Sequence, residues 1–255
     1  MKKISLLCFV ALVGVTQLFA ARSFDLKDLT SGTFYPENLK EVTPLMDGES
    51  YTRISPDGSK ILKMSFSTDQ QTAVLFDIKK ARGANLTSFD GYIISPDGSR
   101  ILIQTNTHHI YRHSFTATYY IYSVENNKLE PLSEGGPQQT PLFSPDGTKI
   151  AFVRDNNIFL VKLLFNNSES QVTKDGKFNE VINGIPDWVN EEEFTNDRSM
   201  VFNADGTMLC WIRYDESAVK MFSFPWYKGS NPEKTEYSDY PGAYTYKYPL
   251  PGYDN

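Results

Sequence analysis

The most chemically suggestive stretch of the sequence is a run of three carboxylates, Glu191–Glu193, which follows the segment Asp187–Asn190. Adjacent carboxylates repel one another, so composition alone favours a solvated acidic loop. Held close together, however, such groups would bind a cation strongly. A free α-ammonium group has three donors that two carboxylates can share. The run is therefore a candidate site for the cationic group of a ligand.

A second candidate stretch, His108–Thr116, contains Arg112 and all three histidines of the chain. His109 and His113 stand four positions apart, as metal ligands on a helix would. The surrounding residues are β-branched and aromatic, however, and a strand would hold the two rings too far apart to share an ion. We therefore predict neither a metal site nor a cofactor here. By composition, Arg112 would ordinarily be a surface cation with its stem lying on an aromatic ring.

Both stretches lie between copies of a repeated turn motif. Ser-Pro-Asp-Gly occurs at positions 55–58, 95–98 and 144–147, and a decayed copy, Asn-Ala-Asp-Gly, occupies 203–206. Proline fixes the backbone of the turn, aspartate bonds back to the main chain, and glycine accepts a positive φ. Alternating apolar residues flank each copy, and further strands are expected at 72–78, 119–124 and 158–164. This pattern predicts an all-β fold of four-stranded antiparallel blades, a β-propeller.

The spacing of the repeats locates the candidate residues. The intervals between successive aspartates of the motif are 40, 49 and 59 residues. If the shortest interval is a bare blade, the other two carry additions, and additions to a blade belong in its loops, where binding residues lie on a rigid scaffold. Arg112 falls in the second interval and the acidic run in the third.

Composition bounds the class of protein. The 255 residues hold 25 Lys+Arg against 31 Asp+Glu, with a mean hydropathy of −0.40. These values exclude a disordered chain and a polytopic membrane protein, and the net charge of −6 does not favour nucleic acid as a partner. Met1–Ala20, with two lysines before an apolar run, reads as a secretory signal peptide, because the run is too short to be a comfortable anchor helix. Cys210, in a strand-like run, is expected to be a buried small hydrophobe.

Catalytic machinery is missing from the sequence. It contains no Gly-x-Ser-x-Gly elbow, no P-loop and no dinucleotide-binding fingerprint, and three clustered histidines give little basis for a triad. Taken alone, this chain is expected to catalyse nothing.

Two segments in combination resemble a known family. Tyr111–Tyr119, with its Arg-His-Ser, and Asp187–Phe194, with its Asp-Trp-Val and Glu-Glu-Glu, resemble the propeller domain of dipeptidyl peptidase IV, in particular its bacterial members. The resemblance continues through Asp215–Val219 and Tyr246–Pro249. It implies a serine exopeptidase that releases N-terminal dipeptides whose second residue is proline or alanine. In that family an eight-bladed propeller covers an α/β-hydrolase domain that carries the catalytic Ser, Asp and His.

The resemblance also implies a domain organisation. Residues 1–20 would be the signal peptide, and 21–255 would be about the first half of the propeller, without the remaining blades or the hydrolase domain. We therefore expect a fragment, inactive by itself, of an exported protein that is periplasmic, attached to the cell surface or secreted, with no integral membrane span after signal cleavage.

The same resemblance assigns roles to residues. Glu192 and Glu193 match the pair that holds the substrate's ammonium group, with Glu191 as their neighbour only, and Arg112 matches the arginine that contacts the carbonyl region of the second residue. Asn190 stands where the family usually has an aromatic residue, which would loosen this segment. An arm around Tyr237–Tyr248 would pack on a second subunit and form a homodimer.

Two alternatives remain open at this stage. A non-enzymatic periplasmic propeller that docks a partner protein explains the repeats equally well. It does not explain why Arg112 and the acidic run occupy the two expanded intervals. A tripeptidyl peptidase of the same family would differ in the distance from the glutamate pair to the nucleophile, which these residues do not contain.

Overall fold

The computed structural model describes residues 25–36, 42–227 and 241–255, and divides the chain into two compact units, 1–41 and 42–255. In the first unit, helix α2 (Leu26–Thr30) begins at Asp25, whose side chain accepts a hydrogen bond from the backbone N–H of Asp28. No helix in these described ranges is long and apolar enough to cross a membrane. The predicted signal peptide, Met1–Ala20, lies outside them.

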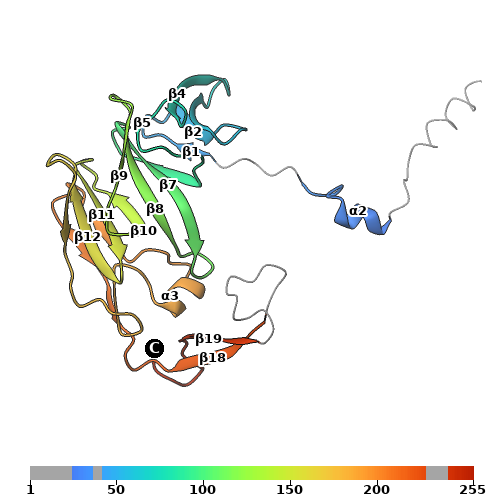
Figure 1. Ribbon diagram of the computed structural model, residues 1–255, viewed down its shortest axis with the longest axis vertical. Coiled ribbons are helices and arrows are strands. Elements are labelled where there is room, and N and C mark those ends of the chain that lie inside the picture. The colour runs from blue at the N-terminus through green and yellow to red at the C-terminus, as the bar shows by residue number, and fades with distance from the viewer. Residues whose placement is uncertain (1–24, 37–41, 228–240) are drawn as a thin grey trace, which may run out of the picture. The chain divides into compact units, whose positions relative to one another are not determined.

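Three antiparallel sheets, called blades 1 to 3 here, make up most of the second unit (Figure 1). Blade 1 consists of β1 (Thr43–Pro44), β2 (Ser50–Ile54), β3 (Lys60–Ser65) and β4 (Gln71–Asp77). Blade 2 consists of β6 (Gly91–Ile94), β7 (Arg100–His109), β8 (Phe115–Ser123) and β9 (Lys128–Pro131), and the short strand β5 (Arg82–Gly83) adds to β9 in parallel. Blade 3 consists of β10 (Gln139–Phe143), β11 (Lys149–Arg154), β12 (Asn157–Lys162) and β13 (Ser168–Gln171). The predicted all-β fold with four-stranded antiparallel blades is confirmed, with β5 as an unpredicted addition.

The core lies between successive blades, because the side chains of each strand alternate between its two faces. In β7, Ile101 and Ile103 pack with Ile61 of blade 1, whereas Leu102 packs with Phe152 of blade 3. The same alternation continues in β11, where Ala151 and Val153 turn away from blade 2 and contact Met200 and Phe202. Strands buried on both faces explain the nearly continuous apolar runs of the sequence.

The repeated motif forms the turn between the first two long strands of each blade. In blade 3 the Asp146 carboxylate accepts from the hydroxyl of Ser144 and from the backbone N–H and hydroxyl of Thr148. In the decayed copy Asn203 replaces the serine, and its Oδ1 accepts from the N–H of Met208 at 2.8 Å, as Ser144 Oγ accepts from the N–H of Lys149 at 2.9 Å. The fourth copy therefore keeps the turn with a different acceptor.

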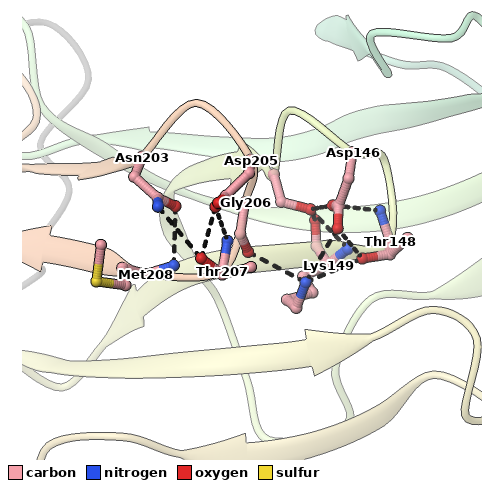
Figure 2. A network of polar contacts seen from close by, with 9 residues as sticks. Asp146, Thr148, Lys149, Asn203, Asp205, Gly206, Thr207 and Met208 are labelled. Atoms are coloured by element: carbon pink, nitrogen blue, oxygen red, sulfur yellow. Dashed lines mark hydrogen bonds and ion pairs between the residues drawn. The ribbon is translucent and has the colours of Figure 1, made fainter.

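Neighbouring turns also contact each other. Figure 2 shows Lys149 Nζ beside the Asp146 carboxylate while it donates at 3.1 Å to the carbonyl of Gly206 in the next turn along the chain. The motif thus fixes both the bend within a blade and the spacing between blades.

The longer intervals do carry additions to the bare blade, but these are not loops alone. The second interval lengthens β7 and β8, whose hairpin reaches toward helix α3 (Trp188–Glu192) in Figure 1. The third contributes β14 (Val181–Asn183) and α3. Two-stranded sheets follow: β15 (Met200–Phe202) with β16 (Leu209–Trp211), β14 with β17 (Arg213–Asp215), and β18 (Met221–Trp226) with β19 (Gly242–Lys247).

The prediction that Cys210 is buried is wrong, because its side chain is exposed. Cys210 pairs with Val201 across β15 and β16, and Val201 is also exposed. The alternate positions of these strands, including Met200 and Phe202, are the ones that pack on blade 3. The prediction assumed cover on both faces of the strand, whereas the described residues cover one.

Candidate functional site

Helix α3 presents the acidic run and is fixed at its start by a carboxylate cap. Asp187 is buried, and its Oδ1 accepts from the backbone N–H of Asn190 at 2.9 Å and from the side-chain Nδ2 of the same residue at 2.7 Å. A side-chain oxygen that satisfies an otherwise unpaired N–H of the first turn is the usual device for starting a helix. Asn190, expected to loosen this segment, instead adds a second bond to the cap.

The three glutamates have three different environments. Glu191 is only 2% exposed, and its Oε1 accepts from the backbone N–H of His113 at 2.9 Å and of Ser114 at 2.7 Å. Glu192 is partly buried, and Glu193, at the C-terminal cap, is exposed. One turn of helix thus directs one carboxylate inward and leaves the next two nearer to solvent.

Arg112, at the tip of the β7–β8 hairpin, and Glu192, on α3, are in direct contact. The Arg112 backbone N–H donates to Glu192 Oε1 at 3.0 Å, and its guanidinium Nε lies 3.2 Å from Glu192 Oε2. The arginine side chain stays 70% exposed while that of Glu192 is 11% exposed. The sequence predicted a carboxylate pair without a partner. Instead, Arg112 already neutralises one member.

Glu193 is the uncompensated member of the predicted pair. Its side chain has no hydrogen bond or ion pair to any residue that the structure describes, and no basic residue lies in the last turn of α3. The C-terminal end of a helix carries partial negative charge, so a carboxylate there is unfavourable and a cation is favoured. The local field therefore favours a positively charged group near Glu193.

Aromatic side chains of the β18–β19 hairpin and the residue after it pack against the two elements that carry the site, α3 and the tip of the β7–β8 hairpin. The ring centroid of Tyr248 lies 4.4 Å from that of Trp188 on α3, and Tyr246 lies 6.1 Å from Trp188. Tyr246 also lies 6.2 Å from Tyr111, the residue before Arg112. The hairpin thus forms a support behind the arginine and the glutamates.

A cavity of about 500 Å³ lies behind α3 and is bordered by Tyr111, Glu191, Glu216 and Lys247. Arg112, Glu192 and Glu193 are not among its lining residues. Burial raises the pKa of the Glu216 carboxyl, with Lys247 opposing and Asp187 adding to the shift. Burial also raises the pKa of the Tyr111 hydroxyl far above its ordinary value.

Two of the histidines, His109 and His113, are held by contacts to protein groups. His109 packs its ring against Phe115 at 5.8 Å, and His113 is held through its backbone N–H. Within the described ranges, no group of three or more His, Cys, Asp or Glu side chains is placed to hold a metal.

Sequence reasoning brought Arg112, Glu192 and Glu193 together, but it missed the bonds of Glu191 and the support from Tyr246 and Tyr248. For the two tyrosines the sequence offered two signals, the aromatic content of the β18–β19 segment and the resemblance over Tyr246–Pro249. It offered none for the bonds of Glu191.

The fold and the site define a class: a β-propeller segment that carries an acid–arginine cluster on elements added to its blades. A family model described as the dipeptidyl peptidase IV N-terminal region matches residues 95–255, more than half of the chain. The chain therefore belongs to the dipeptidyl peptidase IV family, as its N-terminal propeller region.

Individual relatives agree with this assignment. The chain is 39% identical over 184 residues to a probable dipeptidyl peptidase 4 of Aspergillus fumigatus, covering 71% of this chain and 23% of that protein. It is 35% identical over 185 residues to the dipeptidyl peptidase 4 of Trichophyton equinum, covering 71% and 22%. The crystal structure of Porphyromonas gingivalis dipeptidyl peptidase 4 superposes with a TM-score of 0.84 at 41% identity, covering 92% of this chain and 32% of that one. The chain thus spans less than a third of the length of these proteins.

Proposed function

We propose that this chain is the substrate-binding propeller portion of an exported serine exopeptidase that releases N-terminal Xaa-Pro and Xaa-Ala dipeptides. The observation that carries the proposal is the contact of Arg112 with Glu192, which joins residues 80 positions apart into one site beside Glu193. The relatives' names as dipeptidyl peptidases support the reaction class. The printed residues hold no Gly-x-Ser-x-Gly motif, so the nucleophile would come from sequence outside them.

The carboxylates would act as a ruler. A substrate's α-ammonium group can bond Glu193, whose charge is unpaired among the described residues, and Glu192, whose oxygens each retain a lone pair beside Arg112. Because the carboxylates would bind the N-terminus of the peptide, only a short stretch of it would fit between them and the nucleophile. Binding at a distance from the reacting carbonyl also orients that carbonyl, so loss of the carboxylates would lower turnover as well as affinity.

The test is a comparison of free and N-acetylated Gly-Pro substrates in the complete protein. Wild type is expected to prefer the free amine strongly. Glu192→Ala and Glu193→Ala are each expected to lower kcat/KM by about 2 kcal/mol, as for loss of a charge-assisted contact. Arg112→Ala is expected to cost less. If the double Ala variant keeps the full preference for the free amine, the carboxylates are only a solvated surface.

Two controls complete the design. Glu130→Ala removes a surface carboxylate that pairs with Lys128 on blade 2, and is expected to leave the preference unchanged. Product analysis on a longer peptide distinguishes release of dipeptides from release of tripeptides. A tripeptide product would leave the carboxylate site intact and refute the proposed distance to the nucleophile.

We further propose that the complete protein is a homodimer that uses the β18–β19 arm. The predicted arm, Tyr237–Tyr248, falls partly outside the described residues, but Trp226 and Tyr227 are exposed at the end of β18. Exposed aromatic residues are common in interfaces. Trp226→Ala/Tyr227→Ala is expected to yield monomers by light scattering, while Phe165→Ala, which removes an exposed ring between β12 and β13, should not. An unchanged dimer mass would count against the arm.

Export is proposed from Met1–Ala20. Cell fractionation should find the protein in the periplasm, on the cell surface or in the medium, and should lose it there when Ile4–Val15 is deleted. Recovery of the intact protein from the cytoplasm only would refute export.

A further inference from the structure

Glu191 is the one glutamate of the run that is turned away from solvent. At 2% exposure, its Oε1 receives two backbone N–H groups, from His113 and Ser114, at 2.9 and 2.7 Å. A carboxylate that accepts two amide donors forms charge-assisted bonds, which are about twice as strong as neutral ones. The bonds cross 78 and 77 positions of sequence, so they connect two separate additions to the scaffold.

The donors lie at a position where the strand ladder provides no partner. The β7–β8 hairpin closes with the N–H of Ile110 donating to the carbonyl of Ser114 at 2.9 Å, and the residues between them belong to neither strand. Their amides would otherwise require water or remain unpaired. Instead, three consecutive N–H groups, those of Arg112, His113 and Ser114, point to the carboxylates of α3.

We propose that Glu191 is a positioning residue: it fixes the hairpin tip on α3 so that Arg112 and Glu192 meet in one geometry. It acts through these two residues and does not touch the substrate, and the inference rests on the function proposed above. Glu192 accepts a hydrogen bond from the backbone N–H of Arg112 and forms an ion pair with its side chain. The arginine side chain is largely exposed, however, and exerts little restraint on the hairpin tip. The buried bonds of Glu191 supply that restraint.

A role in positioning and a role in charge make opposite demands on the side chain. Glu191→Gln keeps the reach and an acceptor oxygen but removes the charge, and its amide nitrogen would face the cavity that Glu191 borders. Glu191→Asp keeps the charge but withdraws the acceptor by one methylene. Neither variant removes the side chain, so both are expected to fold.

In the complete protein, Glu191→Asp is expected to lower kcat/KM for Gly-Pro substrates roughly tenfold to a hundredfold, since displacement of a catalytic arrangement by about 1 Å costs that much. Adding Arg112→Ala to Glu191→Asp should cost little more, because both act on the same geometry. Glu191→Gln should stay within about threefold of wild type and keep the preference for the free amine. The inference is overturned if Gln loses that preference, which would make Glu191 an ammonium ligand, or if the Asp and Arg112 effects multiply.

Hydrogen exchange tests, without reference to activity, whether Glu191 holds the hairpin tip on α3. We call this set of bonds the clamp. The peptide spanning 110–116 is expected to be protected in wild type and Glu191→Gln and to exchange faster in Glu191→Asp. Glu193→Ala, which removes an exposed carboxylate of the same helix, is the matched control for protection. Equal exchange in all four proteins would refute the clamp. A protein with the predicted exchange pattern but no peptidase activity would instead refute the proposed function and leave the clamp standing.

Discussion

Carboxylates serve two parts of this molecule in opposite ways. In the repeated turns, Asp97 accepts from the N–H of Ser99, two positions away, at a site open to water. At the site, Glu191 accepts from the N–H groups of His113 and Ser114, almost 80 positions away, in a buried setting. The chemistry of the bond is the same, but the range in sequence and the access of water differ.

The difference teaches where function was added to the scaffold. A local bond at the surface is easily replaced by water or by another nearby acceptor, so the turn tolerates change. In the fourth copy Asn203 stands in place of serine, and its side-chain oxygen accepts the corresponding N–H, that of Met208. A buried bond between distant segments cannot be replaced in this way, because the donors have no other partner. The turns build the blades, and the long-range bonds assemble the site on them.

The largest expected effect comes from removing the buried acceptor. Glu191→Ala leaves two buried N–H groups unpaired, each worth about 1–3 kcal/mol, so we expect the unfolding free energy to fall by about 2–4 kcal/mol. Urea-induced unfolding would measure it. The contrast is Asp97→Ala, expected to cost about 1 kcal/mol because water reaches the freed N–H. Equal losses of unfolding free energy in the two variants would show that the buried carboxylate contributes no more to stability than the one in the turn.

The next effect tests whether the turns act only within their own blade. Gly206 has a φ of +70°, and an added Cβ would lie 3.0 Å from the Asp146 carboxyl of the neighbouring turn. Gly58 has nearly the same φ, +69°, with nothing within 4 Å. Gly58→Ala should therefore cost about 1 kcal/mol of backbone strain, and Gly206→Ala about 1 kcal/mol more, measured as shifts in urea midpoint. Identical costs would show that the contact between turns adds nothing.

The sequence predicted the scaffold because its signals are local. Pro56, Asp57 and Gly58 act within one turn, and an apolar run such as Ile101–Ile103, whose side chains face alternate sides, is a property of a single strand. Strand β5 was missed because two residues in a parallel bridge leave no periodic pattern.

The site was predicted in a different way. The spacing of the repeats located the additions, and the resemblance placed Arg112, Glu192 and Glu193, which the structure brings into one region. Composition could not have told Glu191 from Glu192, because their environments depend on a hairpin tip far away in sequence. The exposure of Cys210 was missed for the same reason: burial is decided by what packs on the strand and not by the strand's own residues.

A smaller effect concerns acid. The Ser144 hydroxyl, followed by the bonds of Thr148 and Lys149, holds the pKa of Asp146 well below its ordinary value of 3.8. A carboxyl with a lowered pKa in the folded state stabilises the fold above its ordinary pKa, and the stabilisation is lost as pH falls through the lowered value. Wild type should therefore exceed Asp146→Asn in stability at pH 7, and the difference should shrink below about pH 4. A difference that does not depend on pH would assign it to hydrogen-bond geometry instead of charge.

The smallest expected effect has the opposite sign and comes from the region of the site. Burial raises the pKa of Glu216, and its side chain has no hydrogen bond within the described part of the chain. A carboxyl with a raised pKa in the folded state destabilises the fold while it is ionised, and this cost disappears as pH falls through the raised value.

Glu216→Gln resembles the protonated form, so it should stabilise the protein at pH 7. The advantage should vanish near and below the ordinary pKa of 4.5. Glu130→Gln is the control for a carboxylate that is partly exposed and paired with Lys128 on blade 2. Should Glu216→Gln destabilise the protein at pH 7, attraction to Lys247 would outweigh burial. Glu216 would then stabilise the fold through its charged partner, as the exposed carboxylates do.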